Sequence, residues 1–412
     1  MRKFSVALSL LGLVLVAAIG MFGQDSHRLP ENFLANMHAK FMTVAPHVNR
    51  NGTETNGTPG VDSLTNWNGY YEAPGFDENG KYRHTWYYNM VGNPPQRGGT
   101  TTINAPVVPV AVTLLNPDGS VLYTYEPTPF VAPALGSPLF QNATFSSSPT
   151  PTQITDAIMR AEFWNVMAPD WHTMLAASQK TTRTMSVPSG YYYYQLKKNG
   201  QCCEYVLIDF NEFGNLLFPS TPTDTTTPIG AAENAGDITT KDISTFLFPN
   251  TYLYFGSPNN CCVLGYHTYD EEPGDASNGN KQKRYVVDYA AYISPGLFGA
   301  SFVDVTGLGH EIAESFNDPF VVSDNKHNLT PWWLSPNGNC QDDLEVGDVV
   351  EGLKNAAYPV TINGKTYHPQ NVALLQWFEF QSPSTAIDGA YSYPDESVIP
   401  SLSPIEDVNC TE

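Results

Sequence analysis

Residues Val305–Pro319 have the sequence VTGLGHEIAESFNDP, and this stretch is the most informative part of the chain for fold and function. Placed at about 100° per residue, its apolar positions form one narrow stripe that predicts a helix over about 302–317. Those apolar positions are Val305, Leu308, Ile312 and Phe316. His310, Glu314 and Asp318 stack on the opposite side. Three possible metal ligands therefore share one face of the predicted helix.

Metal binding is one of two hypotheses for this face. His310 and Glu314 are one helical turn apart, the spacing that places two ligands on one ion. A carboxylate ligand makes the site anionic and admits Mn²⁺ or Ca²⁺ besides Zn²⁺. The competing hypothesis is an amphipathic helix with a solvated polar face. Gly307 and Gly309 favour the metal site, because each costs roughly 1 kcal/mol inside a helix and so indicates the close approach of another backbone or a ligand. The simpler alternative is a helix that begins later, near Gly309.

Segments rich in Tyr, Val, Ile and Phe precede this helix and predict β-strands. Residues 105–115 are the clearest strand, and further strand patterns lie between 190 and 295, separated by polar loops. This order favours an α+β fold, a mixed β-sheet backed by a few helices, including the metal-site helix, with many loops. We expect one large domain over 61–412, with a possible sub-boundary near 220–240.

The N-terminus predicts export. Two basic residues precede an apolar run from Phe4 to Phe22, the pattern of a signal peptide over 1–23. An uncleaved anchor is the alternative, because a run of about 19 residues can span a bilayer. Residues 24–60 have little apolar periodicity and predict a flexible leader. We therefore expect a secreted or periplasmic protein without stable membrane insertion after cleavage.

The chain is strongly acidic, with 41 Asp and Glu residues against 20 Lys and Arg and a net charge of −21. Removal of residues 1–23 takes away two basic residues and no acidic one, so the mature protein is more acidic still. This charge argues against nucleic acid and anionic membrane surfaces as partners. It suits a soluble exported protein or a cation binder. The substrate that we expect is a peptide or a cell-wall polymer.

Six cysteines lie in the mature part, as the vicinal pairs 202–203 and 261–262 plus Cys340 and Cys410. In an exported protein they favour disulfides. Because a bond within a vicinal pair is strained, we expect cross-links between the two pairs and a bond between Cys340 and Cys410. A thiolate metal site is disfavoured, because the Cys-x-x-Cys spacing is missing.

A second acidic cluster follows the helix and offers alternative metal ligands. Glu345 and Asp348 lie in this cluster and compete with Asp318 for the role of third ligand, and an acidic loop without a metal is the alternative. Three further histidines are candidates for an additional ligand or for stabilising an oxyanion: His267, His327 and His368.

The sequence His310-Glu311-x-x-Glu314 resembles the active-site helix of zincin-type metallopeptidases, with Glu replacing the second His. The resemblance covers about a dozen residues. It implies His310 and Glu314 as Zn²⁺ ligands and Glu311 as the general base. The function expected from it is a secreted, metal-dependent hydrolase, most simply a zinc peptidase.

Three blocks between about 200 and 330 resemble the plant phosphate-induced, Exordium-like secreted proteins. The blocks are 261–267 (CCVLGYH), 283–289 (KRYVVDY) and 317–320 (NDPF). This resemblance implies an alternative function, a non-catalytic extracellular or cell-wall-associated protein with a structural cation or a carbohydrate-binding role.

Overall fold

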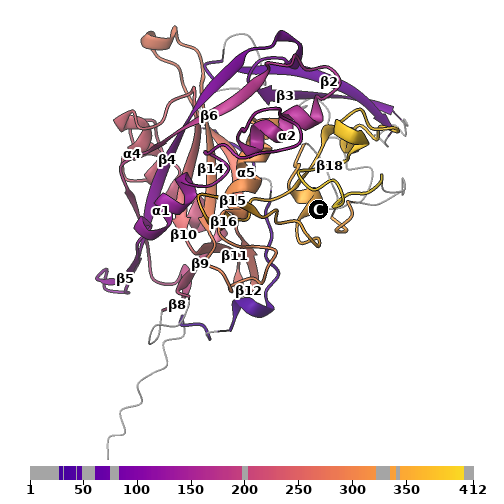
Figure 1. The fold of residues 1–412 in the computed structure, drawn as a ribbon. Coiled ribbons are helices and arrows are strands. Elements are labelled where there is room, and N and C mark those ends of the chain that lie inside the picture. Colours follow the sequence, from indigo (N-terminus) through magenta and orange to yellow (C-terminus); the bar gives the residue numbers. More distant parts are fainter. Residues whose placement is uncertain are drawn as a thin grey trace, which may run out of the picture.

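The computed structural model of this chain describes residues 27–30, 32–42, 44–48, 61–74, 83–196, 203–321, 335–339 and 344–402. A curled, mixed eight-stranded sheet forms the centre, and several small sheets surround it (Figure 1). The fold is α+β, which confirms the class predicted from the sequence.

The central sheet has the strand order β1-β13-β14-β10-β4-β5, and β6 and β7 also pair with β4. Its strands are β1 (His47–Val48), β4 (Thr100–Leu115), β5 (Val121–Tyr125), β6 (His172–Gln179), β7 (Arg183–Val187), β10 (Ile243–Pro249), β13 (Gly265–Glu272) and β14 (Lys283–Tyr292). β10 is parallel to both β14 and β4, whereas β13 and β14 are antiparallel. β10 is buried along its whole length, as expected for an apolar strand covered on both faces.

Smaller sheets and six α-helices complete the described fold. A four-stranded sheet contains β12 (Ser257–Val263), β11 (Thr251–Phe255), β9 (Tyr205–Asp209) and β8 (Tyr192–Gln195). Three two-stranded sheets pair β2 (Asn66–Pro74) with β3 (Arg83–Val91), β15 (Val360–Ile362) with β16 (Lys365–Tyr367), and β17 (Val372–Ala373) with β18 (Ser392–Tyr393). The helices are α1 (Thr128–Leu135), α2 (Ile154–Glu162), α3 (Phe210–Leu217), α4 (Pro228–Ala235), α5 (Thr306–Asn317) and α6 (Leu375–Phe378).

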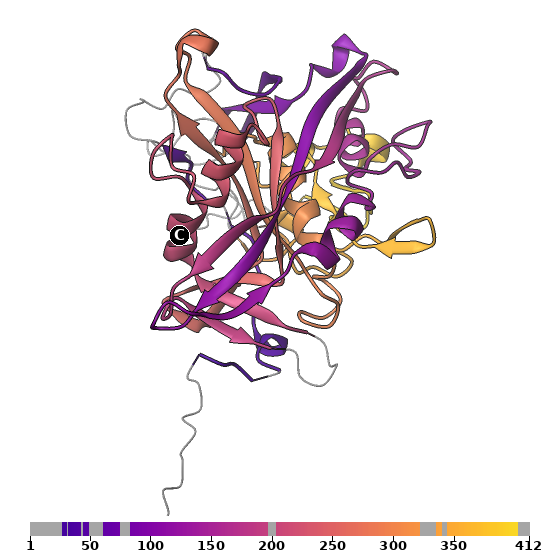
Figure 2. The same ribbon diagram turned by 90° about the vertical axis from the view of Figure 1, so that its left-hand side faces the viewer.

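Apolar cores lie on both faces of the central sheet. On one face, strand residues pack with α2, α5 and the C-terminal segment, and on the other they pack with α3 and α4. Figure 2 shows the sheet between these two layers. Ile229 of α4 belongs to the same core cluster as Phe246 of β10, so the region 220–240 is part of the domain core.

Helix α5 is buried along its entire length (Figure 1). It packs against β13 and β14 of the central sheet and also contacts α2 and β3. It ends at Asn317, as predicted, but begins at Thr306 rather than near residue 302. The apolar stripe lies in a core cluster, whereas Glu314 contacts His267 of β13 and Ser315 donates a hydrogen bond to Asp288 of β14. A Cβ atom at Gly309 would lie 3.1 Å from the backbone nitrogen of Gln370, which confirms the close backbone approach predicted there.

The predicted flexible leader over 24–60 is wrong for the part that the structure describes. His47 and Val48 form β1, which pairs in parallel with β13. Phe41 is buried and stacks on the His310 ring, with 3.7 Å between the ring centroids. The apolar residues of this segment are irregularly spaced, so neither a helical nor a strand period in the sequence predicted that they would be buried.

The predicted cross-link between the two vicinal cysteine pairs is also wrong, because Cys261 and Cys262 are bonded to each other. Their shared peptide bond is cis. Cys202, Cys340 and Cys410 lie outside the described residues, and the Cys340–Cys410 bond stays a prediction.

The predicted signal peptide over 1–23 also lies outside the described residues. Within the part of the chain that the structure describes, no helix is both long and apolar enough to cross a membrane.

Candidate metal centre

Six titratable side chains converge between α5, β13 and the segment 345–348. They are His310, Glu311 and Glu314 of α5, His267 of β13, and Glu345 and Asp348. Five of them are buried, and the sixth, Asp348, has a side chain that is 19% exposed. The hypothesis of a solvated helix face is therefore wrong.

Two histidines approach one carboxylate oxygen, Oε2 of Glu314. His310 Nε2 lies 3.0 Å from it and His267 Nδ1 lies 3.3 Å from it. The register of β13 explains the second contact, because His267 and Tyr269 alternate with residues of the opposite face and so lie toward α5.

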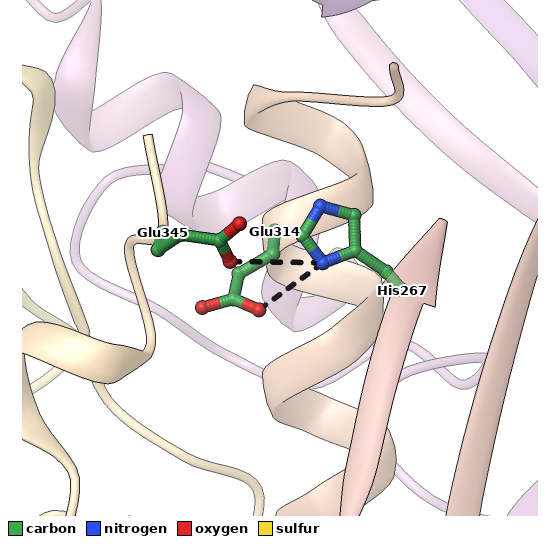
Figure 3. Close-up of side chains that lie close together, drawn as sticks. All are labelled: His267, Glu314 and Glu345. Atoms are coloured by element: carbon green, nitrogen blue, oxygen red, sulfur yellow. Dashed lines mark ion pairs between the residues drawn. The ribbon is translucent and has the colours of Figure 1, made fainter. Parts of the chain in front are cut away.

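Each histidine has a second acidic neighbour of its own. Glu345 Oε2 lies 3.8 Å from His267 Nδ1, and Figure 3 shows both side chains pointing toward Glu314. Asp348 Oδ1 lies 3.3 Å from His310 Nε2. The six side chains thus contain two trios that share Glu314: His267–Glu314–Glu345 and His310–Glu314–Asp348. In each trio the possible ligand atoms lie within 4.8 Å of one another.

The outer nitrogen of each histidine is held by a hydrogen-bond acceptor. His267 Nε2 donates to the carbonyl oxygen of Asp318 at 3.2 Å. His310 Nδ1 donates to Gln370 Oε1 at 3.2 Å, and the Gln370 amide group is oriented in turn because its Nε2 donates to the carbonyl oxygen of Gly347 at 2.7 Å. In neutral imidazoles this arrangement leaves a lone pair on each inner nitrogen, the arrangement found in metal-ligating histidines.

The other carboxylate oxygen of Glu314 is held by the backbone. Oε1 accepts hydrogen bonds from the N–H groups of Gly347 at 3.0 Å and Asp348 at 3.3 Å. A Cβ atom at position 347 would lie 2.5 Å from the His310 ring, so only glycine fits there. Oε2 is thus left facing the two histidines.

Buried negative charge dominates the centre. Burial raises the pKa of Glu345 and Asp348, and the charge of Glu314 raises it further. Burial acts to lower the pKa of His267 and His310, but the surrounding carboxylates outweigh it and raise both pKa values well above their usual range. A buried group of this kind needs protons or cations to compensate its charge.

Glu311 lies beside the shared group, with its Oε2 atom 3.8 Å from His267 Nδ1. Burial raises its pKa to about 8, against the opposing influence of the two histidines. Gly265 makes room for it, since a Cβ atom there would lie 2.4 Å from Glu311 Oε1. A carboxyl group with a pKa near neutrality has the proton affinity that general-base catalysis requires.

Asp318, the third ligand predicted from helical spacing, does not join either trio. The helix ends at Asn317, and Asp318 has the non-helical angles φ −148° and ψ 71°. Pro319 follows it, and a residue before proline is disfavoured in the helical conformation. Asp318 contributes its backbone carbonyl to His267 instead, and Glu345 and Asp348, the competing candidates, occupy the acidic positions.

Of the three further candidate histidines, the structure brings only His267 to the group. His368 is one-third exposed, and its Nδ1 atom lies at hydrogen-bond distance, 2.7 Å, from Asp304 Oδ2. His327 lies outside the described residues. The positions of Gln370 and Phe41 around His310 were not predicted, because they come from distant segments without a recognisable motif.

The donor set fits a divalent transition metal. Two ligand atoms that each lie about 2.1 Å from one Zn²⁺ ion are separated by about 3.0–3.4 Å at octahedral to tetrahedral angles. The distances of 3.0, 3.3 and 3.3 Å from the histidine nitrogens to Glu314 and Asp348 match that separation. Mixed nitrogen and oxygen donors suit Zn²⁺ or Mn²⁺ better than Ca²⁺, which prefers oxygen alone.

No protein-family model matches this chain, and neither a curated protein nor a solved structure matches it. The zincin-like and Exordium-like resemblances therefore stay predictions, and function has to be argued from the site.

Proposed function

We propose that this protein is a secreted, metal-dependent hydrolase, most simply a zinc peptidase. The observation that carries the proposal is the pair of histidines whose outer nitrogens are held by acceptors and whose inner nitrogens face Glu314. Export rests on the signal-peptide pattern of residues 1–23.

The proposal gives each residue of the group a role. His310, Glu314 and Asp348, together with His267 and Glu345, hold the metal, with Zn²⁺ or Mn²⁺ preferred by the donor set. The bound metal would polarise a substrate carbonyl and acidify water. Glu311 accepts a proton from the attacking water and delivers it to the leaving amine, a role that suits its raised pKa of about 8. Asp348 is the most exposed member, so we place substrate approach on its side.

The substitution Glu311→Gln tests this role. It removes the proton acceptor but keeps the volume of the side chain, so we expect bound metal to be unchanged and kcat/KM for peptide cleavage to fall by roughly 10²–10⁴-fold. Metal is measured by elemental mass spectrometry and activity with a library of fluorescence-quenched peptides. Retained activity in this variant would rule out the mechanism.

Glu162→Gln is the matched control. Glu162 at the end of α2 is another buried glutamate, 1% exposed, whose pKa is raised by burial and by the charge of Glu379. It changes the same chemical group at a similar burial without touching the six-residue centre. Activity and metal content should both equal those of the wild type.

A second candidate function is a structural cation site in a non-catalytic extracellular protein, as the Exordium-like resemblance implies. Near-complete burial of five of the six side chains favours it, because closed sites are typical of structural metals and open ones of catalytic metals. In that case Glu311→Gln would have no functional effect, the wild type would cleave no peptide, and metal removal would lower only the free energy of unfolding.

A further inference from the structure

We infer that the centre binds two divalent ions, one in each trio, with Glu314 Oε2 as the bridging ligand. This inference rests on the metal binding proposed above and extends it from one ion to a dinuclear centre. Two-ion centres bridged by carboxylates serve several classes of hydrolase, aminopeptidases among them.

The first argument is the arrangement of ligands around Glu314. Each trio has its own histidine and its own second carboxylate, and only Glu314 is common to both. Oε2 lies 3.0 Å from one histidine nitrogen and 3.3 Å from the other. Each of these distances matches the separation of two ligand atoms on the same metal ion. Oε1 is already engaged by two backbone N–H groups, which fixes the carboxylate and leaves Oε2 as the bridge.

The second argument is that both inner nitrogens are unsatisfied. Among the described residues, His267 Nδ1 and His310 Nε2 make no hydrogen bond of acceptable geometry, although both residues are fully buried. The two nitrogens lie beside different pairs of carboxylates, which have only Glu314 in common, and this indicates two separate ligand positions.

The third argument is charge. Glu311, Glu314, Glu345 and Asp348 carry up to four negative charges, and histidines that act as metal ligands are neutral. One divalent ion would balance at most two of these charges, and the buried carboxyl groups of Asp288, Asp318 and Glu351 nearby add negative charge that a second divalent ion would help to balance. Uncompensated buried charge is strongly destabilising, so the second ion has a clear energetic basis.

Reconstitution with Mn²⁺ alone tests the inference. The purified protein is stripped with a chelator, reloaded with Mn²⁺ and desalted, and bound Mn²⁺ is counted by elemental mass spectrometry. We expect two Mn²⁺ per chain and an electron paramagnetic resonance spectrum of an exchange-coupled pair. One Mn²⁺ per chain with the spectrum of an isolated ion would overturn the inference, and this measurement needs no variant.

Three variants locate the ions. His267→Ala and His310→Ala should each retain one uncoupled Mn²⁺, and Glu314→Ala should lose the coupled pair. Circular dichroism checks that each variant folds. If the wild type binds one ion and each histidine variant binds none, the two histidines share one metal and the inference is wrong.

Glu272→Gln is the control for a different location of the second ion. Glu233, Asp270 and Glu272 form another group whose possible ligand atoms lie within 4.8 Å of one another. The variant should keep two coupled ions. If the two ions of the wild type are not exchange-coupled and Glu272→Gln loses one of them, the second ion binds at Glu233, Asp270 and Glu272. That result would refute the dinuclear centre.

These outcomes separate the inference from the proposed function. One ion with peptide cleavage that depends on Glu311 would refute the dinuclear centre and leave the hydrolase standing. Two coupled ions without hydrolysis of any peptide would support the dinuclear centre and refute the peptidase. A protein that binds no metal would refute both.

Discussion

Strand β13 carries an acidic group on each of its two faces, and the two groups differ in how their charge is compensated. Toward α5, His267 joins Glu314, Glu345 and the rest of the proposed metal centre. Toward α4, Asp270 and Glu272 face Glu233. Proximity of carboxylates is therefore common to both faces and cannot by itself identify a metal site.

The difference lies in the nitrogen atoms around each group. The α4-side group contacts one histidine and lies near one lysine, because His47 Nδ1 contacts Asp270 and the charge of Lys283 lowers the pKa of Glu272 against the effect of burial. The α5-side group has two histidines whose outer nitrogens are held by acceptors and whose inner nitrogens face carboxylates. If the proposed assignment is correct, the hydrogen bonds behind the ligands, rather than the number of acids, distinguish the metal centre from the other acidic group.

The largest expected effect is that of Glu314→Ala on the metal-loaded protein. The variant removes the residue common to both trios and leaves the surrounding buried groups unpaired, so we expect the free energy of unfolding to fall by about 3–5 kcal/mol. Denaturant titration in the presence of Zn²⁺ measures it. The corresponding change on the other face, Glu233→Ala, should cost much less, and equal losses would erase the proposed difference between the two groups.

The next largest effect is the pH dependence of the stability of the metal-free protein. Burial raises the pKa of Glu311 from 4.5 to about 8, so the folded state holds this proton more tightly than the unfolded state. Its stabilising contribution is therefore complete below pH 4.5 and is lost as the pH rises to about 8. The raised pKa values of Glu345 and the two histidines act in the same direction.

Glu314 has a lowered pKa and acts in the opposite direction, but only below pH 4.5. We therefore expect the melting temperature of chelator-treated protein to fall between pH 5 and pH 8, and saturating Zn²⁺ to abolish this decrease. Scanning calorimetry at several pH values measures both. A metal-free protein whose melting temperature rises over this range would contradict the account.

Gln370→Leu should have a smaller effect, on metal affinity alone. The variant removes the acceptor that orients His310, and loss of such a partner typically weakens metal binding by about 10–100-fold. Competition with a chromophoric chelator gives the affinity. His47→Gln, which changes the histidine of the α4-side group, should leave it unchanged, and similar losses in the two variants would argue against a specific role for Gln370.

The smallest effect is expected from Glu272→Gln. Burial and the charge of Asp270 raise the pKa of Glu272 to about 7, so the variant removes an unfavourable buried charge above that pH. At pH 8 we expect a small increase in the free energy of unfolding, because a neutral amide replaces a buried carboxylate that is charged at this pH. A large stability loss in denaturant titration with Ca²⁺ or Zn²⁺ present would show that this group binds a cation too.

Helix α5 and the proximity of His310 to Glu314, two of the proposed ligands, could be predicted because the information is local. Apolar residues recur at the helical period, and His310 and Glu314 are one turn apart on the same segment. Extension of that period to Asp318 failed because Pro319 favours the end of the helix, a signal that the sequence already contained.

The positions of the remaining proposed ligands depend on tertiary structure. His267 reaches the centre through the register of β13 against β14, and Phe41 reaches His310 through a segment without periodicity. Glu345 and Asp348 were recognisable as candidates from their acidic cluster, but their choice over Asp318 depends on how residues 344–348 pack against α5. Side-chain periodicity specifies one element at a time and cannot specify such contacts.

Anomalous X-ray diffraction from crystals of the Zn²⁺-loaded protein tests the central claim most directly. The account predicts anomalous peaks at the zinc absorption edge on both sides of Glu314 Oε2, one beside His267 and one beside His310. Well-diffracting crystals with no peak within ligand distance of Glu314, or with a peak only between Glu233, Asp270 and Glu272, would contradict it.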